Sequence, residues 1–281
     1  MIIVDTHAHL QFRAYDKDRN EVIKRCLDKG VWTINVGTNY ETSKAAVELA
    51  RKCKEGIFAS VGLHPINLDT GLVKIRVDPN EDSHPEKYFD YEKYRELAKN
   101  PKVVAIGEVG LDYYWKPKTK GRLEEFKKMQ KELLALQLKL AKELDLPVIF
   151  HCRVAHSDLL EILNSNPKSQ TPKLRGVIHS FTGSWDDAQR FLALGFYLGF
   201  NGIIFKKIEG LDFEINIKNT PLNRMLIETD CPYLTPSKES GRNEPIFIKH
   251  IIQKIADTKG VSCEEVGEIT AKNAHKLFGV Q

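Results

Sequence analysis

The sequence predicts an α/β fold, namely a barrel of eight parallel strands in which most strands are followed by a helical segment. Eight short apolar runs, bounded by Gly, Pro, Asn or Asp, recur along the chain with helical patterns between them. Parallel strands that are buried on both faces read as such continuous apolar runs. The length of 281 residues also suits a barrel, which typically takes about 250 residues. We therefore predict a single, somewhat irregular (β/α)8 TIM-type barrel over residues 1–281.

The predicted strands and helices alternate through most of the chain. The strands are the apolar runs at residues 2–6, 31–37, 57–62, 103–109, 147–152, 176–180, 197–203 and 225–230. The clearest helical pattern between them covers residues 124–144. The apolar side chains that recur on its predicted face are Phe126, Met129, Leu133, Leu136 and Leu140.

Three parts of the chain depart from this alternation. Residues 206–221, after the seventh strand, predict only a short helix, and two extra helices at about 245–258 and 263–277 close the chain. Residues 67–90, after the third strand, carry two prolines, an acidic cluster and a small KIRV run. We expect a surface insertion or a short hairpin on the loop face there. This segment either shapes a substrate groove or is tolerated without a function.

The composition limits the class of protein and its compartment. With 42% hydrophobic and 28% charged residues, the chain has enough apolar material for a large core. Five cysteines without a CxxC motif argue against a disulfide framework and predict a reducing, cytoplasmic location. We expect no signal peptide and no membrane span, and a net charge of +4 does not by itself indicate nucleic-acid binding. A monomer is the default expectation.

Six side chains that are able to bind metal ions stand at the ends of predicted strands. They are His7, His9, Glu108, His151, His179 and Asp230. The first two are two residues apart, so both imidazoles point to the same side of an extended chain. In a parallel barrel the C-terminal strand ends converge on one face, where barrel enzymes build their active sites. Imidazole and carboxylate groups suit divalent zinc, manganese or magnesium, so the pattern predicts a metal-dependent hydrolase.

Residues beside these six have more than one interpretation. His64 follows the third strand and is either a group just outside the metal ligands, a substrate-binding group or a loop histidine without a role. Arg153 shares the face of His151, where its guanidinium suits either a phosphate or a salt bridge with a rim carboxylate. Glu228 should point into the barrel one layer below Asp230 and orient a ligand histidine.

Other cysteines and histidines are expected to be structural. Strand alternation turns Cys152 and Cys231 away from the metal candidates, so buried thiols are favoured over ligands. The remaining histidines fall in the insertion or in helical segments, where surface or packing roles are expected. They are His84, His156, His250 and His275.

An aromatic and basic stretch comes directly after the fourth strand. Stacking of Tyr113, Tyr114 or Trp115 on a splayed terminal base is one interpretation, with Tyr113 as the substrate-binding candidate. Core packing under the loop is the other interpretation for at least one of the three. The cations that follow either contact phosphates or form a solvated helix start, and they are Lys116, Lys118, Lys120 and Arg122.

Together these motifs resemble those of the TatD-type metal-dependent deoxyribonucleases, which belong to the amidohydrolase-like barrel superfamily. The resemblance covers nearly the whole chain and is carried, in order, by DTHAHL, NVGTNYETS, SVGLHP, AIGEVGLDYYW, PVIFHCR, HSFTGS, ETDCPYL, RNEP and NAHKLFG. It implies two metal ions, one held by His7, His9, Glu108 and Asp230, the other by Glu108, His151 and His179. The similar phosphotriesterases bridge their metals with a modified lysine, which the run VVAIGEVG lacks, so Glu108 is the implied bridge. Asp112, Asn243 and Glu244 are expected to order the rim.

The resemblance also implies a reaction and a substrate. A metal-activated water would hydrolyse phosphodiester bonds in DNA, with Asp230 and Glu108 as catalytic carboxylates and His64, Arg153 and Tyr113 as substrate-binding residues. The implied activity is that of a 3′-5′ exonuclease on single strands or 3′ ends, with a role in DNA repair or degradation. One alternative is a metal-dependent ester hydrolase such as a D-aminoacyl-tRNA deacylase. Another is an inactive barrel that serves as a binding module, against which the complete set of six residues argues.

Overall fold

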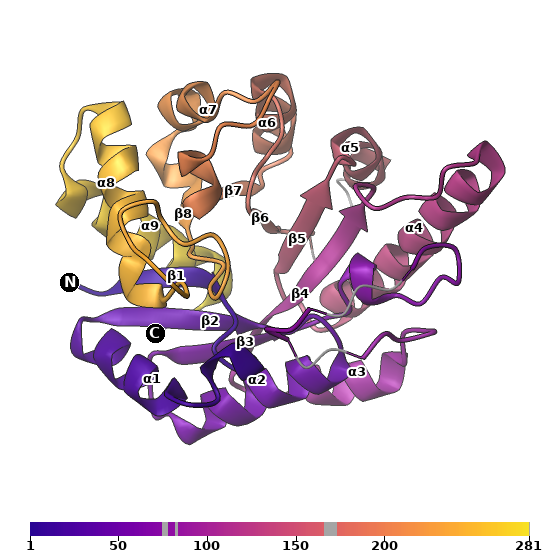
Figure 1. Cartoon of the computed structure of the whole chain (residues 1–281), viewed down its shortest axis with the longest axis horizontal. Helices are drawn as coiled ribbons and strands as arrows, with labels where there is room; N and C mark the ends of the chain where they lie inside the picture. Colours follow the sequence, from indigo (N-terminus) through magenta and orange to yellow (C-terminus); the bar gives the residue numbers. More distant parts are fainter. Residues whose placement is uncertain (75–77, 82–83, 166–172, 281) are drawn as a thin grey trace.

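The computed structural model describes residues 1–74, 78–81, 84–165 and 173–280. At its centre, eight parallel strands form one sheet in which they are ordered as in the chain (Figure 1). The strands are β1 (Ile3–Ala8), β2 (Val31–Val36), β3 (Ile57–Val61), β4 (Val103–Asp112), β5 (Val148–Arg153), β6 (Gly176–Ile178), β7 (Tyr197–Phe200) and β8 (Met225–Ile227). All eight predicted strands are present, and the predicted (β/α)8 barrel is confirmed.

Helices lie around the outside of these strands (Figure 1). The α-helices are α1 (Arg19–Asp28), α2 (Tyr40–Lys52), α3 (Tyr91–Ala98), α4 (Lys120–Glu143), α5 (His156–Ser165), α6 (Trp185–Ala193), α7 (Phe213–Asn219), α8 (Ile248–Lys259) and α9 (Cys263–Phe278). The short 3-10 helices are η1 (Arg13–Tyr15), η2 (Pro65–Asn67), η3 (Gly202–Phe205), η4 (Leu222–Arg224) and η5 (Pro245–Phe247). The segment after β7 is irregular, as predicted, since α7 has only seven residues. Within the described residues, no helix combines the length and the apolar character needed to cross a membrane.

The barrel is nearly closed where β1 meets the segment after β8. The Thr6 hydroxyl donates a hydrogen bond to the Ile227 carbonyl at 3.2 Å, and the Asp230 amide donates to the His7 carbonyl at 2.8 Å. The chain then continues beside β1 through an isolated parallel bridge between Ala8 and Cys231. This seam therefore brings Asp230, which follows β8, next to His7 and His9 at the end of β1.

Two apolar clusters fill the two sides of the sheet. The larger cluster lies between strands and surrounding helices, and the smaller one collects one or more side chains from each strand. Its strand members include Val4, Ile34, Phe58, Val104, Ile149, Val177, Tyr197 and Leu226. Residues of α9, among them Ala274 and Phe278, pack against these side chains. Since α9 contacts β1 and β8 and lies beside β1 (Figure 1), it covers the barrel interior away from the strand ends that carry the metal candidates.

The buried face of α4 differs in part from the predicted one. Phe126, Leu133 and Leu140 are buried as expected, but Leu136 is 43% exposed. Gln130 and Gln137 are buried instead. Their amides hydrogen-bond the backbone N–H and C=O groups of Asp112, at the end of β4, and of Leu63, just after β3, at 2.8 to 3.1 Å, which satisfies polar groups that the helix covers.

The described parts of the insertion at 67–90 are anchored to the barrel. Leu68 and Glu86 form an isolated parallel bridge. The Glu86 carboxylate accepts hydrogen bonds from the Tyr40 amide at 2.7 Å and from the Tyr94 hydroxyl at 2.8 Å. Of the KIRV run only Lys74 is described, so the expected hairpin lies outside the described residues.

Candidate metal centre

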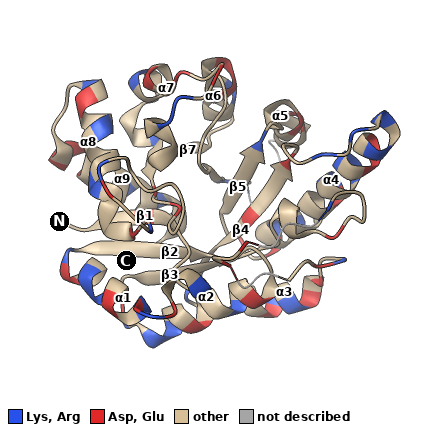
Figure 2. Cartoon of the chain, in the orientation of Figure 1, with Lys and Arg blue, Asp and Glu red and all other residues tan. Residues whose placement is uncertain are grey.

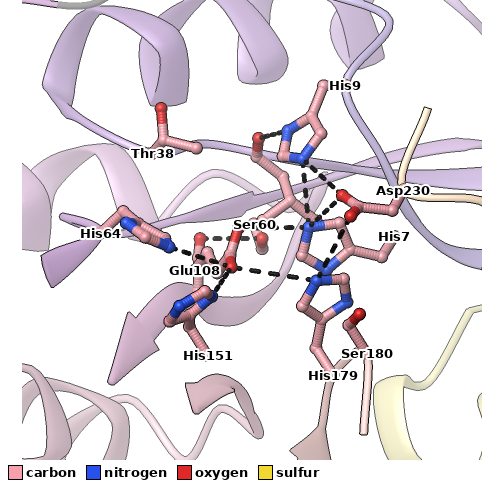
Figure 3. Close-up of polar contacts among 12 residues, drawn as sticks. His7, His9, Thr38, Ser60, His64, Glu108, His151, His179, Ser180 and Asp230 are labelled. Atoms are coloured by element: carbon pink, nitrogen blue, oxygen red, sulfur yellow. Dashed lines mark hydrogen bonds and ion pairs between the residues drawn. The ribbon is translucent and has the colours of Figure 1, made fainter. Parts of the chain in front are cut away.

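The C-terminal strand ends bring all six metal candidates together (Figure 3). The residues and their positions are His7 in β1, His9 just after it, Glu108 in β4, His151 in β5, His179 just after β6, and Asp230 after β8. Five of the six line a cavity of about 910 Å³, and His7 is fully buried against them. The convergence follows from the parallel arrangement, because every strand ends on the same face of the barrel.

Glu108 lies at the centre of this group, between imidazoles on both sides (Figure 3). Its Oε2 is 3.3 Å from His7 Nε2, whereas its Oε1 is 2.7 Å from His151 Nδ1 and 3.9 Å from His179 Nε2. Burial alone would raise the pKa of this carboxyl. The charges of His64 and His7 and the hydrogen bond from His151 instead hold the pKa well below its ordinary value. Glu108 is therefore a carboxylate whose Oε2 faces His7, whereas its Oε1 faces His151 and, at a longer distance, His179.

The side of Glu108 Oε2 suits a divalent ion. His7 Nε2 lies 3.2 Å from His9 Nε2, and His9 Nε2 lies 3.4 Å from Asp230 Oδ1. Two imidazole nitrogens at this distance share only one proton, whereas a cation accepts the lone pairs of both and of the carboxylate. His7, His9 and Asp230 thus form a donor set that fits a metal ion.

Acceptors outside the cluster fix the orientation of three imidazoles. The contacts are His9 Nδ1 to the Val36 carbonyl at 2.7 Å, His179 Nδ1 to Glu228 Oε1 at 2.8 Å, and His151 Nε2 to Asp112 Oδ2 at 3.0 Å. In each ring the nitrogen next to the acceptor carries a proton, which leaves the other nitrogen to face the cluster. This outer acceptor is the usual partner of a metal-binding histidine. Glu228 therefore lies where the sequence places it, behind a candidate ligand.

The same acceptors change the pKa of two imidazoles. Burial would lower the pKa of His151, but the hydrogen bonds to Asp112 and Glu108 raise it to about 9. Burial would also lower the pKa of His179, and the neighbouring Glu228 carboxylate raises it to about 10. In the metal-free protein both rings consequently hold an additional proton at neutral pH, and ligation of a metal would release it.

His64 differs from the other imidazoles of the cavity. Its Nδ1 accepts a hydrogen bond from the Ile66 amide at 3.0 Å, so its proton must reside on Nε2. That nitrogen points toward Glu108 Oε1 at 3.2 Å. Burial and the charge of His151 lower the pKa of His64, which favours the neutral ring. Although His64 is close enough to Glu108 and His151 to complete a donor set, its cavity-facing nitrogen is a hydrogen-bond donor.

Residues 4–279 match the family described as TatD related DNase. The chain belongs to this family. A relative from Bacillus subtilis, named uncharacterized metal-dependent hydrolase YabD, is 37% identical over 99% of this chain and all of its own length. The 3′-5′ ssDNA/RNA exonuclease TatD of Shigella flexneri is 34% identical over 98% of each chain. The TatD homologue YJJV of Escherichia coli has a crystal structure that superposes with a TM-score of 0.80 at 28% identity, over 99% of this chain and 98% of its own.

Membership of the TatD family makes this protein a metal-dependent hydrolase. The resemblance inferred from the motifs is thereby confirmed. Its His, Glu and Asp side chains at the strand ends form groups that are able to bind metal ions.

The three aromatic candidates of this TatD protein differ in whether they reach the cavity. Tyr113, predicted to bind substrate, does not line the cavity, because its ring is buried and its hydroxyl bonds Asp158 at 2.9 Å. Tyr114 and Trp115 line the cavity and are 48% and 41% exposed. Arg153 also lines the cavity, and its guanidinium carbon lies 3.7 Å from the centre of the Tyr114 ring. Stacking on an aromatic ring is thus its observed contact, rather than a salt bridge.

Several cavity residues have no signal in the sequence. Glu81, from the insertion, is buried beside the cavity and accepts hydrogen bonds from the Thr38 hydroxyl and from the Asn67 amide at 3.4 Å. Tyr233 lines the same cavity, as does His156, which was expected to be a surface or packing residue. The acidic cluster around Glu81 is visible in the sequence, but only the fold shows that it reaches the site.

The remaining expectations concern the thiols and the RNEP segment. Cys152 and Cys231 are buried as predicted, and burial raises the pKa of the Cys231 thiol to about 12. Glu244 pairs with Arg25 at 2.7 Å and with Arg242 at 3.0 Å. The Asn243 side chain donates to the Thr229 carbonyl at 3.0 Å, next to Asp230.

Backbone strain is concentrated around the cavity. Within the described residues, four of the five non-glycine residues with positive φ line it, and they are Val154, Ser180, Asp230 and Leu234. β6 and β8 end at Ile178 and Ile227, short of their predicted ends, and the residues at those predicted ends, Ser180 and Asp230, have left-handed conformations. Such strain persists where the surrounding structure holds it in place, as at functional sites.

Proposed function

We propose that this protein hydrolyses phosphodiester bonds in DNA and removes nucleotides from the 3′ ends of single strands. The observation that carries the proposal is the position of Glu108, whose Oε2 faces His7 while its Oε1 faces His151 and His64. A carboxylate shared by two ions is the usual centre of a two-metal phosphodiesterase site. The name of the Shigella relative, a 3′-5′ ssDNA/RNA exonuclease, supports nucleic acid as the substrate and the 3′ end as the point of attack.

The residues of the cluster would hold two divalent ions. One would be held by His7, His9, Glu108 and Asp230, and the other by Glu108, His151 and His179. When bound, such ions activate water and neutralise the charge that develops on a phosphate. Mixed nitrogen and oxygen ligands suit zinc, manganese or magnesium.

Asp230 is placed to accept the proton of the attacking water. Burial would raise its pKa, but the hydrogen bond from His9 and the charges of His179 and His7 keep it below the ordinary value. The carboxylate is therefore ionised at neutral pH. Its Oδ1 faces His9, and its Oδ2 lies 3.9 Å from His179 Nε2 on the wall of the cavity.

His64 and Arg153 supply the hydrogen-bond donors for the substrate. The Nε2–H of His64 lies at the cavity wall, where it would donate a hydrogen bond to an oxygen of the phosphate or to the leaving oxygen. The guanidinium of Arg153, held flat on Tyr114, presents its edge to an anion at the cavity mouth.

The test compares three variants on a labelled single-stranded oligonucleotide. Asp230→Asn and His151→Ala should each lower kcat/KM at least about 100-fold, because each removes several kcal/mol of transition-state stabilisation. His250→Ala is the matched control, since His250 pairs with Glu239 on the surface and does not line the cavity. Near wild-type release of nucleotides by Asp230→Asn would refute the proposal. Parallel incubations with RNA and with mischarged tRNA distinguish exonuclease activity from deacylation.

A further inference from the structure

A second cavity of about 440 Å³ adjoins the metal centre. It lies between the loop after β4, the start of α4 and the described part of the insertion, and Trp115 lines both cavities. Its lining residues are Leu72, Val73, Lys74, Trp115, Lys116, Pro117, Lys118, Thr119 and Arg122. The Arg122 guanidinium donates to the Leu72 carbonyl at 3.2 Å and joins the two walls. We call this cavity the basic groove.

The charge of the basic groove is one-sided. Four of its lining residues are cations and none is a carboxylate. Over the described ranges of the chain, Lys74, Lys116, Lys118 and Arg122 form no ion pair. Some lysines elsewhere on the surface do form ion pairs, as Lys131 does with Asp158 and Lys99 with Glu96. Figure 2 shows the cationic ribbon at the end of α4 that is distant from the barrel centre.

We propose that the basic groove binds the sugar–phosphate backbone of a single-stranded nucleic acid, on the 5′ side of the nucleotide being removed. The inference rests on the proposed function, because it places the 3′ end of that strand in the metal centre. Unpaired cations in a groove attract a chain of phosphates and release its counterions. A strand that ends at the metal centre and continues into the basic groove passes Trp115, which is the residue that both cavities share.

The junction between the two cavities is built to contact bases. Tyr114 and Trp115 pack edge to face with ring centres 4.8 Å apart, and both rings are partly exposed. Arg153 stacks on Tyr114 and adds a cation at the same point. Every base has a π face, so an aromatic platform holds a single strand without a sequence preference. The base pairs of a duplex hide these faces, and the geometry thus favours an unpaired strand.

The experiment uses one double variant and one matched control. Lys116→Gln with Lys118→Gln removes two groove charges. Lys44→Gln with Lys276→Gln removes two exposed charges that line neither cavity and form no ion pair with another described residue. Both are measured as metal-loaded protein on a single strand of about twelve nucleotides and on a dinucleotide, which is too short to reach past Trp115. Binding of the longer strand is followed separately by fluorescence anisotropy in the presence of a chelator.

We expect the groove variant to lower the ratio of kcat/KM for the long strand to that for the dinucleotide about tenfold, and the control to leave the ratio unchanged. Two fewer phosphate contacts also flatten the salt dependence, so between about 50 and 200 mM salt the wild type should lose about sevenfold more affinity for the strand than the groove variant.

Equal ratios and equal salt slopes in the groove and control variants would overturn the groove assignment. If the wild type cleaves neither substrate, the proposed function fails. Binding of the longer strand to the wild type and to the two double variants, followed by anisotropy, then still decides whether the groove binds the strand. Tighter binding of a duplex than of the single strand would also contradict the inference.

Discussion

At the residue scale, the decisive feature is which nitrogen of each imidazole faces the cavity. The sequence identifies the histidines by their position at strand ends, but the hydrogen bonds made by their outer nitrogens come from other parts of the chain. The Val36 carbonyl and Asp112 accept hydrogen bonds from two of the rings, and Glu228 pairs with the outer nitrogen of His179, so that the other nitrogen of each ring faces the cluster. His64 Nδ1 instead accepts a hydrogen bond from the Ile66 amide, so the proton of the neutral ring is on Nε2 and that nitrogen is a hydrogen-bond donor.

Because His151 offers a lone pair to the cluster and His64 offers a proton, their substitutions should differ in their effect on metal content. His151→Ala should lose about one equivalent of bound metal together with activity, because it removes a ligand of one ion. His64→Ala should keep its metal and lose about 100- to 1,000-fold in kcat, the usual effect of removing a hydrogen-bond donor to the charge that develops in a transition state. Metal content is measured by mass spectrometry of the native protein. If His64→Ala also lost metal, His64 would be a ligand and its assignment as a donor would be wrong.

At the element scale, small side chains on neighbouring strands create the space for the outer acceptors. Gly199 in β7 is the clearest case, because a Cβ atom there would lie 2.7 Å from Glu228 Oε2. Glu228 has no room to move away, since its Oε1 also accepts from the Ser180 amide at 2.6 Å and is fully buried. A methyl group in β7 would thus displace the carboxylate that orients His179.

We predict that Gly199→Ala weakens metal binding without unfolding the barrel. Displacement of an outer acceptor typically lowers metal affinity about 10- to 100-fold, and the affinity is measured by competition with a chelator. Gly121→Ala is the matched control, because no atom lies within 4 Å of a Cβ at this exposed position. Unchanged affinity in Gly199→Ala would show that Glu228 does not act through His179. Circular dichroism confirms that both variants retain the fold.

The predicted elements differ in how completely sequence periodicity describes them. The eight apolar runs gave the correct strands because a buried parallel strand needs apolar side chains on both faces. The face of α4 was predicted less well, since burial of Gln130 and Gln137 depends on carbonyl and amide groups of the loops that they bond. Tyr113 and Tyr114 are adjacent and chemically alike, and only the packing of Tyr113 against Asp158 decides which ring reaches the cavity.

At the scale of the whole molecule, the metal centre lies across the seam that closes the barrel. His7 and His9 come from the first strand, and Asp230 follows the last. Backbone hydrogen bonds join them, from Asp230 to the His7 carbonyl at 2.8 Å and from His9 to the Cys231 carbonyl at 2.9 Å. The buried Asp5 carboxylate also accepts from the Thr229 amide at 2.9 Å. A metal ion held by both sides would add to this closure.

Metal loading should therefore raise the thermal stability of the protein. Saturation at about 100 times Kd contributes about 2.7 kcal/mol, or about 5 °C in Tm for a chain of this size. Protons compete for the same nitrogens, because the pKa values of metal-free His151 and His179 are raised to about 9 and about 10. Metal affinity hence falls as the pH falls below about 9, and the gain in Tm should be smaller at pH 6 than at pH 8. Calorimetry with and without a chelator measures the gain, and an equal gain in Asp230→Asn would place the metal elsewhere.

The sequence by itself determined the eightfold βα alternation, the strand ends that carry the six metal candidates, and the family to which the chain belongs. These follow from local patterns, because apolar periodicity and short motifs are written in consecutive residues. Only the tertiary structure decided which nitrogen of each histidine faces the cavity, that Tyr114 and not Tyr113 reaches it, and that the insertion and α4 enclose a basic groove. Each of these depends on partners far away in the chain, whose positions are fixed only when the barrel closes.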